Sequence, residues 1–176
     1  MFEKLCCVAV ALFSVSSAAH PAEPGATLVP TAVIALKGCW EGRGEVMGKP
    51  VTISVVARPI VQDAMWALEA ESSAVADTRD SYSAHLVFGG ANRREAAADQ
   101  IVGYWADSFG GAFAASGRGE SRSDGFDMTY RYPDNDFVNR WRFLEDRLTW
   151  RIAARDGKGI EKPFASYSLH KKACRP

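Results

Sequence analysis

Few side chains in this sequence have the type and spacing that catalysis or metal binding requires. His85 and Asp107 could act as a general acid–base couple if both faced one cavity, although a surface histidine and a solvated turn aspartate are the simpler interpretation. The sequence contains no G-x-S-x-G, H-E-x-x-H or Cys-x-x-Cys motif, so the usual settings of a serine nucleophile and of a zinc site are missing. We therefore expect no metal site, and no residue is assigned a catalytic role.

Copper is the one metal for which the residues leave an alternative. If cleavage after Ala19 made His20 the first residue, its amine and imidazole together could chelate copper. A complete copper brace would also need an inward histidine, which only His85 or His170 could supply, and the proline-containing start of the chain argues against such a rigid site.

Aromatic rings with a few polar groups form the more promising set, because they suit the binding of a small apolar molecule. A polar amide on an otherwise apolar face, such as Asn139, also needs a hydrogen-bonding partner. Such rings are equally the usual content of a filled core, so both interpretations stay open. The expected wall of the binding site consists of Trp66, Trp105, Tyr130, Asn139, Trp141 and Tyr167.

These side chains are positioned by short segments with period-two alternation, which is the pattern of β-strands with one buried face. Glycine, proline and aspartate clusters separate the segments. The predicted strands are 39–47, 50–58, 65–72, 82–88, 100–107, 111–118, 125–132, 137–144, 148–154 and 164–171. About ten strands at this spacing predict an all-β protein, either a sandwich or, as we prefer, a single antiparallel up-and-down barrel. A barrel of that size encloses enough interior to hold one small ligand.

Three segments complete the expected organisation. Residues 1–19 combine Lys4, an apolar run and small residues before the cut, as in a secretory signal peptide, so we expect a periplasmic or secreted protein without a membrane-spanning segment after cleavage. Residues 20–35 form a linker and a short helix, for which Thr31–Lys37 could supply one or two turns, and 36–176 form the barrel. A brief helical insert is expected at Asn92–Asp99.

Two cysteines remain after removal of the signal peptide, and both fall on the outer face by alternation. In the first strand, Cys39 points to the face that Trp40 does not use. At the end of the last strand, Cys174 points to the face that the inward Leu169 does not use. The first and last strands of a closed barrel are neighbours, so we predict a Cys39–Cys174 disulfide, which an oxidising compartment would favour. Two free thiols are the alternative.

The charge balance limits the partners. The chain has 21 Lys and Arg residues against 21 Asp and Glu residues, and it carries no basic block. Binding to nucleic acid or to anionic lipid is therefore disfavoured, and a small hydrophobic molecule is the expected partner. The oligomeric state is not assigned.

The opening "GCWEGRGEV" (residues 38–46), after a short helical lead-in, resembles the G-x-W signature of the calycin superfamily, which includes lipocalins, fatty-acid-binding proteins and nitrobindin-like barrels. Residues 104–126 are similar to the middle of uncharacterised secreted bacterial barrels of this kind. The resemblance implies that Trp40 closes one end of the barrel beneath an arginine, for which we prefer Arg151 over Arg140 and Arg142. The other lipocalin motifs and the C-terminal helix are missing. Haem is not expected as a cofactor, because the only late histidine, His170, faces outward by parity.

The sequence therefore favours an exported calycin-like barrel that binds a small hydrophobic or aromatic molecule in its lumen. An enzyme of isomerase, cyclase or lyase type that uses the same lumen is the first alternative. A filled barrel with a structural or interaction role is the second.

Overall fold

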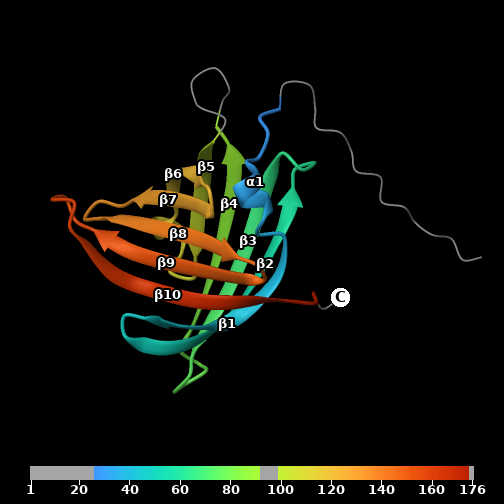
Figure 1. The fold of residues 1–176 in the computed structure, drawn as a ribbon. Coiled ribbons are helices and arrows are strands. Elements are labelled where there is room, and N and C mark those ends of the chain that lie inside the picture. The colour runs from blue at the N-terminus through green and yellow to red at the C-terminus, as the bar shows by residue number, and fades with distance from the viewer. Residues whose placement is uncertain (1–25, 92–98, 175–176) are drawn as a thin grey trace, which may run out of the picture.

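The computed structural model describes residues 26–91 and 99–174, and they form one closed, antiparallel up-and-down barrel of ten strands (Figure 1). Each strand pairs with its neighbours in the sequence, and β1 pairs with β10 to complete the ring. The strands are β1 (Gly38–Val46), β2 (Lys49–Ile60), β3 (Met65–Ala74), β4 (Ser81–Gly90), β5 (Gln100–Asp107), β6 (Ala115–Arg122), β7 (Gly125–Arg131), β8 (Asp136–Leu144), β9 (Arg147–Arg155) and β10 (Glu161–Lys172). The predicted all-β barrel is confirmed.

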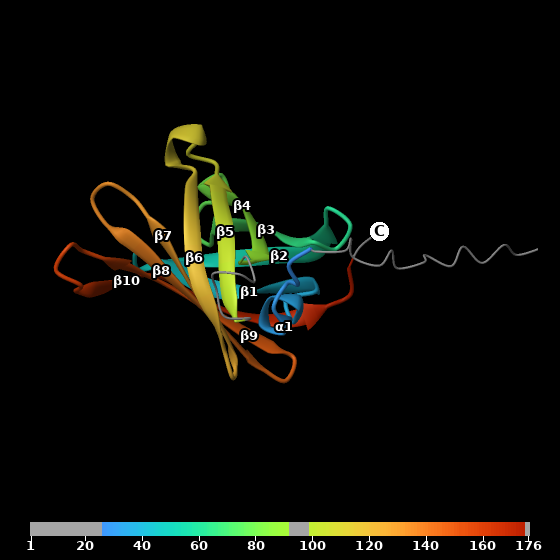
Figure 2. The same cartoon turned by 90° about the horizontal axis from the view of Figure 1, so that it is seen from above.

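Within the described residues, helical structure is confined to two short elements. The helix α1 (Thr31–Ile34) occupies the start of the predicted 31–37 segment, and the 3₁₀ turn η1 (Gly111–Phe113) joins β5 to β6. Figure 2 shows α1 against one end of the barrel, while the coiled turn between β5 and β6 projects away from it. The expected signal peptide and most of the expected insert at 92–99 lie outside the described residues.

One strand prediction was wrong in its position. A strand was expected at 111–118, but β6 begins at Ala115, and the apolar stretch before it forms η1. Gly110 adopts a φ of 97°, which turns the chain out of the sheet, and the Phe113 side chain remains 51% exposed instead of packing inward. Gly117 and Gly119 of β6 lie on the inward face, opposite the buried side chains of Tyr130 and Met128.

The glycines in "GCWEGRGEV" have a packing role inside the barrel. Gly44 lies opposite Tyr167 in the register of β1 and β10, and a β-carbon there would lie 2.7 Å from the Tyr167 ring and 2.1 Å from the Ser166 carbonyl oxygen. The same holds for Gly117 on β6, where a β-carbon would lie 2.7 Å from the ring of Tyr130 on β7. Bare backbone at these positions therefore lets two lumen tyrosines lie against the adjacent strand.

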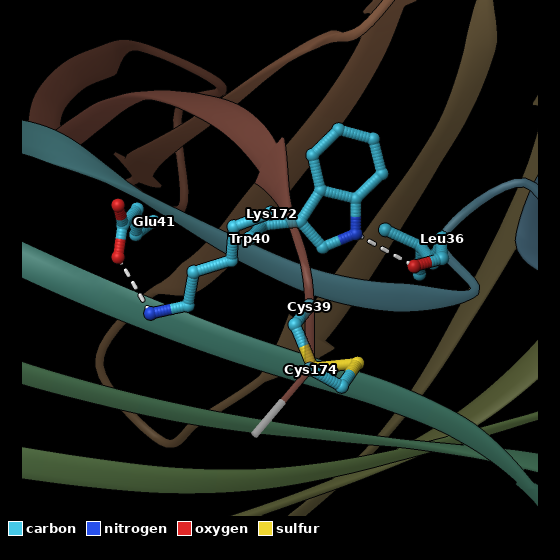
Figure 3. Close-up of a disulfide and its surroundings, with 6 residues drawn as sticks. All are labelled: Leu36, Cys39, Trp40, Glu41, Lys172 and Cys174. Atoms are coloured by element: carbon cyan, nitrogen blue, oxygen red, sulfur yellow. Dashed lines mark hydrogen bonds and ion pairs between the residues drawn. A yellow bond between two sulfur atoms is a disulfide. The ribbon is translucent and has the colours of Figure 1, made fainter. Parts of the chain in front are cut away.

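One end of the barrel is plugged. Val33 and Leu36, from α1 and the turn after it, are fully buried in the same core as Trp40. The Trp40 indole Nε1 donates a hydrogen bond of 2.7 Å to the Leu36 carbonyl oxygen (Figure 3). This bond fastens the segment before β1 to the first strand of the barrel. Leu36 therefore satisfies the one polar atom of a tryptophan that would otherwise be buried without a partner.

The cation over Trp40 is a lysine and not the expected arginine. Lys171 pairs with Trp40 across the β1–β10 ladder, and its Nζ lies 5.2 Å from the centroid of the indole ring. Arg151 lies on β9 with an exposed side chain, in register with Ser166 and Arg140. Lys171 shares the inward parity of Leu169, and at the barrel end its long stem reaches over the ring while its ammonium stays near water.

The predicted disulfide between Cys39 and Cys174 is confirmed. The two α-carbons lie 5.2 Å apart, and the bond fastens the residues after β10 to the first strand (Figure 3). Next to it, the Lys172 ammonium donates a hydrogen bond to the Glu41 carboxylate, also across the β1–β10 seam. This contact lowers the pKa of Glu41 below its usual value. A covalent bond and an ion pair therefore both hold the seam at its plugged end.

Removal of the disulfide should lower the free energy of unfolding substantially. The bond closes a loop between residues 135 apart in sequence, for which the chain-entropy model gives about 3–5 kcal/mol. Urea unfolding of a Cys39→Ser/Cys174→Ser variant should show a loss of that size with native circular dichroism in the absence of urea. If both cysteines of the oxidised wild-type protein react with iodoacetamide under native conditions, the bond is not formed.

Candidate functional site

The deep half of the lumen is filled by stacked aromatic rings. Trp141 lies at the centre, 4.6 Å from Phe126 and 5.4 Å from Trp150 between ring centroids, with both pairs nearly parallel. Phe88 meets Phe126 and Trp141 edge-on at 5.5 and 5.6 Å. Such stacked and edge-to-face pairs stabilise a core beyond the burial of their area. These rings form a solid floor beneath the rest of the lumen.

Asn139 is satisfied within this floor. Its Oδ1 accepts a hydrogen bond of 2.9 Å from the Trp150 indole Nε1, and both side chains are buried. The partner that this inward amide was expected to need is therefore Trp150 on the adjacent strand. Four other buried polar atoms have no such partner among the described residues: the indole Nε1 atoms of Trp66 and Trp141 and the hydroxyl groups of Ser121 and Tyr130. A buried donor without an acceptor is costly, so water or a ligand is the natural complement.

The outer half of the lumen differs from the floor in its contact with solvent. Floor residues such as Phe88, Phe126, Met128 and Trp141 are completely buried. Inward residues nearer the opposite end each keep 5–8% of their surface exposed; they are Ile53, Ala70, Ser72, Ala84, Trp105, Ile152, Ala165 and Tyr167. These residues line the lumen at the end opposite α1. We call this set, with Tyr82 and Asp107, the mouth.

Asp107 brings a carboxylate to the mouth. It ends β5 on the same face as Trp105, and its Oδ2 accepts hydrogen bonds of 2.9 Å from both the Tyr82 hydroxyl and the Trp105 indole Nε1. Its Oδ1 accepts a third bond of 2.9 Å from the backbone N–H of Phe109. Three donors fix its orientation, yet no Lys, Arg or His of the described residues lies within ion-pair distance of it.

The residues beside Asp107 on the neighbouring strands have small side chains. Ala84 on β4 is directly opposite Asp107 in the strand register, and Ala70 on β3 is directly opposite Ala84. Both side chains stop at the β-carbon, whereas Trp105, on the same strand as Asp107, and Tyr167, on β10, carry large rings. A carboxylate thus lies between two small residues and an aromatic wall, which is an arrangement suited to a flat molecule with a hydrogen-bond donor or positive charge at one end.

Exposed aromatic rings border the mouth. Phe109 is 71% exposed and lies 5.7 Å from Tyr82 and 6.0 Å from Phe113, between ring centroids. The Tyr132 hydroxyl donates a hydrogen bond of 3.0 Å to the Phe113 carbonyl oxygen, which fastens the β5–β6 turn to β7. The rim therefore presents apolar surface to solvent at the point where a ligand would approach.

Tyrosines of the lumen are poor acids in this environment. Burial raises the pKa of Tyr167 to about 12. Burial also raises the pKa of Tyr82 and of Tyr130, and for Tyr82 the negative charge of Asp107 adds to the effect. These hydroxyls are therefore neutral hydrogen-bonding groups at ordinary pH.

The predicted wall residues are only partly brought together. Trp105, Tyr130, Asn139, Trp141 and Tyr167 form one contiguous cluster around Trp150, with Trp105 and Tyr167 reaching the mouth. The sixth, Trp66, opposes Phe88 near the plugged end, away from the mouth. Whether any of these residues binds a ligand stays a prediction.

Two residues of the mouth were missed or misjudged from the sequence. Asp107 was interpreted as a solvated turn residue, and Tyr82 received no role. Asp107 follows Trp105 by two residues in the same strand, so it lies on the same face as Trp105. This spacing was the signal that could have placed Asp107 inward. His85, the proposed partner of Asp107, faces outward, where its Nδ1 lies 3.7 Å from Glu69 with a half-exposed side chain, so the acid–base couple does not form. His170 also faces outward, beside Glu41.

Residues 26–91 and 99–174 contain neither a metal-binding cluster nor a membrane-spanning helix. Within these ranges, no three His, Cys, Asp or Glu side chains gather as a metal site would require. None of the helices there has the length and apolarity to cross a bilayer.

Comparison with known proteins identifies the class of fold. No protein-family model matches the chain, and no curated protein matches it by sequence. Among solved structures, the chain is similar to Rv2717c from M. tuberculosis, with 16% identity and a TM-score of 0.61 over 82% of this chain and 99% of that one. It is also similar to the S-type phycobiliprotein lyase CPES from Guillardia theta, with 13% identity and a TM-score of 0.56 over 82% of this chain and 92% of that one. The protein therefore has a calycin-like ten-stranded barrel fold.

The burial of the lumen tyrosines predicts a loss of stability in alkali. A raised pKa means that the unfolded chain loses its phenolic protons first, so above about pH 10 stability falls as pH rises. For Tyr167 this loss should continue to its folded pKa of about 12. The slope should reach about 1.4 kcal/mol per pH unit for each tyrosine that stays protonated in the folded state. Urea unfolding between about pH 9 and pH 11 measures it, with Tyr167→Phe as the matched variant of smaller slope. Equal slopes for both proteins would contradict the assignment of Tyr167.

Proposed function

We propose that this protein is an exported barrel that binds a small, largely apolar molecule in the mouth of its lumen. The observation that carries the proposal is Asp107, a carboxylate oriented by three hydrogen bonds at an aromatic wall, without a cationic partner among the described residues. Trp105 and Tyr167 would contact the apolar body of the ligand, and Asp107 would accept a hydrogen bond from its polar end. A ligand with an amine or another donor fits this arrangement best.

The free energy available is sufficient for useful affinity. Transfer of roughly 300 Å² of apolar ligand surface from water contributes about 7 kcal/mol before the entropic cost of association. A charge-assisted hydrogen bond to Asp107 would add to this and would select the orientation. The exposed rings of Phe109 and Phe113 would provide the first apolar contacts.

Export rests on separate observations. Residues 1–19 have the composition of a signal peptide, and the Cys39–Cys174 disulfide suits an oxidising compartment. Mass spectrometry of the protein from the producing cell would give a mature chain that begins near His20, whereas an intact Met1 would contradict export.

An enzyme of isomerase, cyclase or lyase type is the second candidate, and the Tyr82–Asp107 pair is the observation in its favour. A phenol that donates to a carboxylate over 2.9 Å could relay a proton to a bound substrate. A third candidate, a filled barrel with a structural role, draws on the stacked rings of the floor. Turnover of a bound compound would favour the enzyme, and failure of every small molecule to bind would favour the filled barrel.

Three probes with one ring and different charges test the proposed binding. 2-Naphthylmethylamine, 2-naphthol and 2-naphthoate should quench the fluorescence of Trp105, and the amine should bind at least tenfold tighter than the carboxylate. In Asp107→Asn this preference should fall to threefold or less, because the negative charge is gone while the hydrogen-bonded shape remains. Asp63→Asn, in the exposed β2–β3 turn, is the matched control and should keep the full preference.

Two results would contradict the proposal. One is equal affinity of the three probes for the wild-type protein. The other is an unchanged preference for the amine in Asp107→Asn. Native mass spectrometry of the protein from its own compartment would complement the titrations, since a copurifying compound reports the natural ligand class directly.

A further inference from the structure

The outer surface of the barrel carries a groove that is separate from the lumen. It has a volume of about 880 Å³ and runs over the outward faces of β5, β6, β7 and β8. That volume lies within the range of small-molecule sites. Five arginines line it, against two carboxylates. The groove is therefore positively charged even though the chain as a whole is neutral.

Three of the five arginines are held by carboxylates. Arg122 pairs with Glu120 and Asp127, at 3.1 and 3.0 Å, and Arg140 pairs with Glu161 at 2.8 Å. The guanidinium of Arg140 lowers the pKa of Glu161, as expected for a close pair. Arg155 likewise pairs with Asp136 at 2.8 Å. The charges of these three arginines are largely compensated within the protein.

The other two arginines of the groove, Arg118 and Arg131, are not paired with carboxylates of the described residues. Neither has a carboxylate of the described residues within ion-pair distance, and both side chains are exposed. Arg118 on β6 is opposite Thr129 on β7, so Arg131 is its diagonal neighbour on the same face. Diagonal neighbours in a sheet have α-carbons about 7–8 Å apart, which two arginine side chains can span to reach a single anion.

An aromatic ring lies beside these two arginines. Tyr104 on β5 is opposite Ser116, while Arg118 is opposite Val102, so Tyr104 is the diagonal neighbour of Arg118 on the other side. Its side chain is 56% exposed and lines the same groove. An exposed tyrosine next to two uncompensated arginines offers stacking and charge together.

We infer that this groove binds a small molecule that combines a phosphate, sulfate or similar multivalent anion with a planar ring. Arg118 and Arg131 contact the anionic group, and Tyr104 stacks on the ring. The site faces away from the lumen, so it is separate from the mouth and requires a ligand of the opposite charge. It does not depend on the function proposed for the mouth.

Titrations with 2-naphthyl phosphate, 2-naphthol and inorganic phosphate separate the two contributions. The wild-type protein should bind 2-naphthyl phosphate at least tenfold tighter than either of the other two. Arg118→Gln/Arg131→Gln should lose at least tenfold in affinity for it, because the uncompensated charges are removed. Tyr104→Leu should lose severalfold for 2-naphthyl phosphate and little for inorganic phosphate. Arg147→Gln, an exposed arginine on β9 outside the groove, is the matched control and should bind as the wild type does.

Amide chemical shifts locate the bound probe. Shifts at Val102, Tyr104, Arg118, Thr129 and Arg131 would support the groove. Shifts confined to Ala84 and Asp107 would place the probe in the mouth and overturn the inference. It is equally overturned if the double variant binds as tightly as the wild type, or if Arg147→Gln loses as much affinity as the double variant does. Binding of this anionic probe in the mouth would also count against the preference for an amine at Asp107, whereas the results of the Arg118→Gln/Arg131→Gln and Arg147→Gln variants do not bear on that preference.

Discussion

The pairing of β1 with β10 is the constraint on which the rest of this structure depends. Without it, Trp40, Gly42 and Gly44 would lie on an open edge, and the lumen would be one face of a curved sheet. Backbone pairing from Cys39 to Val46 closes the ring, and the disulfide, the Glu41–Lys172 ion pair and Lys171 over Trp40 all support one end of it. The other end of the seam relies on main-chain pairing and side-chain packing.

Closure gives the interior two unlike halves. Large rings from β4 and β7–β9 pack around Trp141 and fill the floor, while small residues on β3 and β4 line the other half. Asp107 lies in the mouth, at the end of the lumen opposite α1. A carboxylate so close to stacked rings is tolerated because Tyr82, Trp105 and the Phe109 amide supply donors, so that its desolvation is offset without a cation.

Period-two alternation was sufficient to predict much of this from the sequence. It placed Trp40, Tyr130, Asn139 and Trp141 inward and both cysteines outward, and the disulfide followed once the ring was assumed to close. It could not say where β6 begins, because alternation continues through residues that the chain turns out of the sheet, so Phe113 was assigned to a strand although it belongs to η1. Asp107 was misjudged although the predicted strand 100–107 has the bounds of β5, because a carboxylate at the end of a strand is usually solvated. The outer groove depends on the curvature of β5–β8 and on which arginines are paired, neither of which a linear pattern contains.

The wide sequence separation of the seam has a consequence for how the chain acquires its structure. Nine of the ten strand pairings join consecutive strands, but the tenth joins residues that lie about the whole domain apart. Contacts this distant carry the largest loop-closure entropy and form slowly. We therefore expect folding to proceed along the meander, with the ring shut in the last and slowest step. Until that step, a nearly complete sheet exposes two unpaired edges, so the newly made protein is most prone to aggregation just before it becomes a barrel.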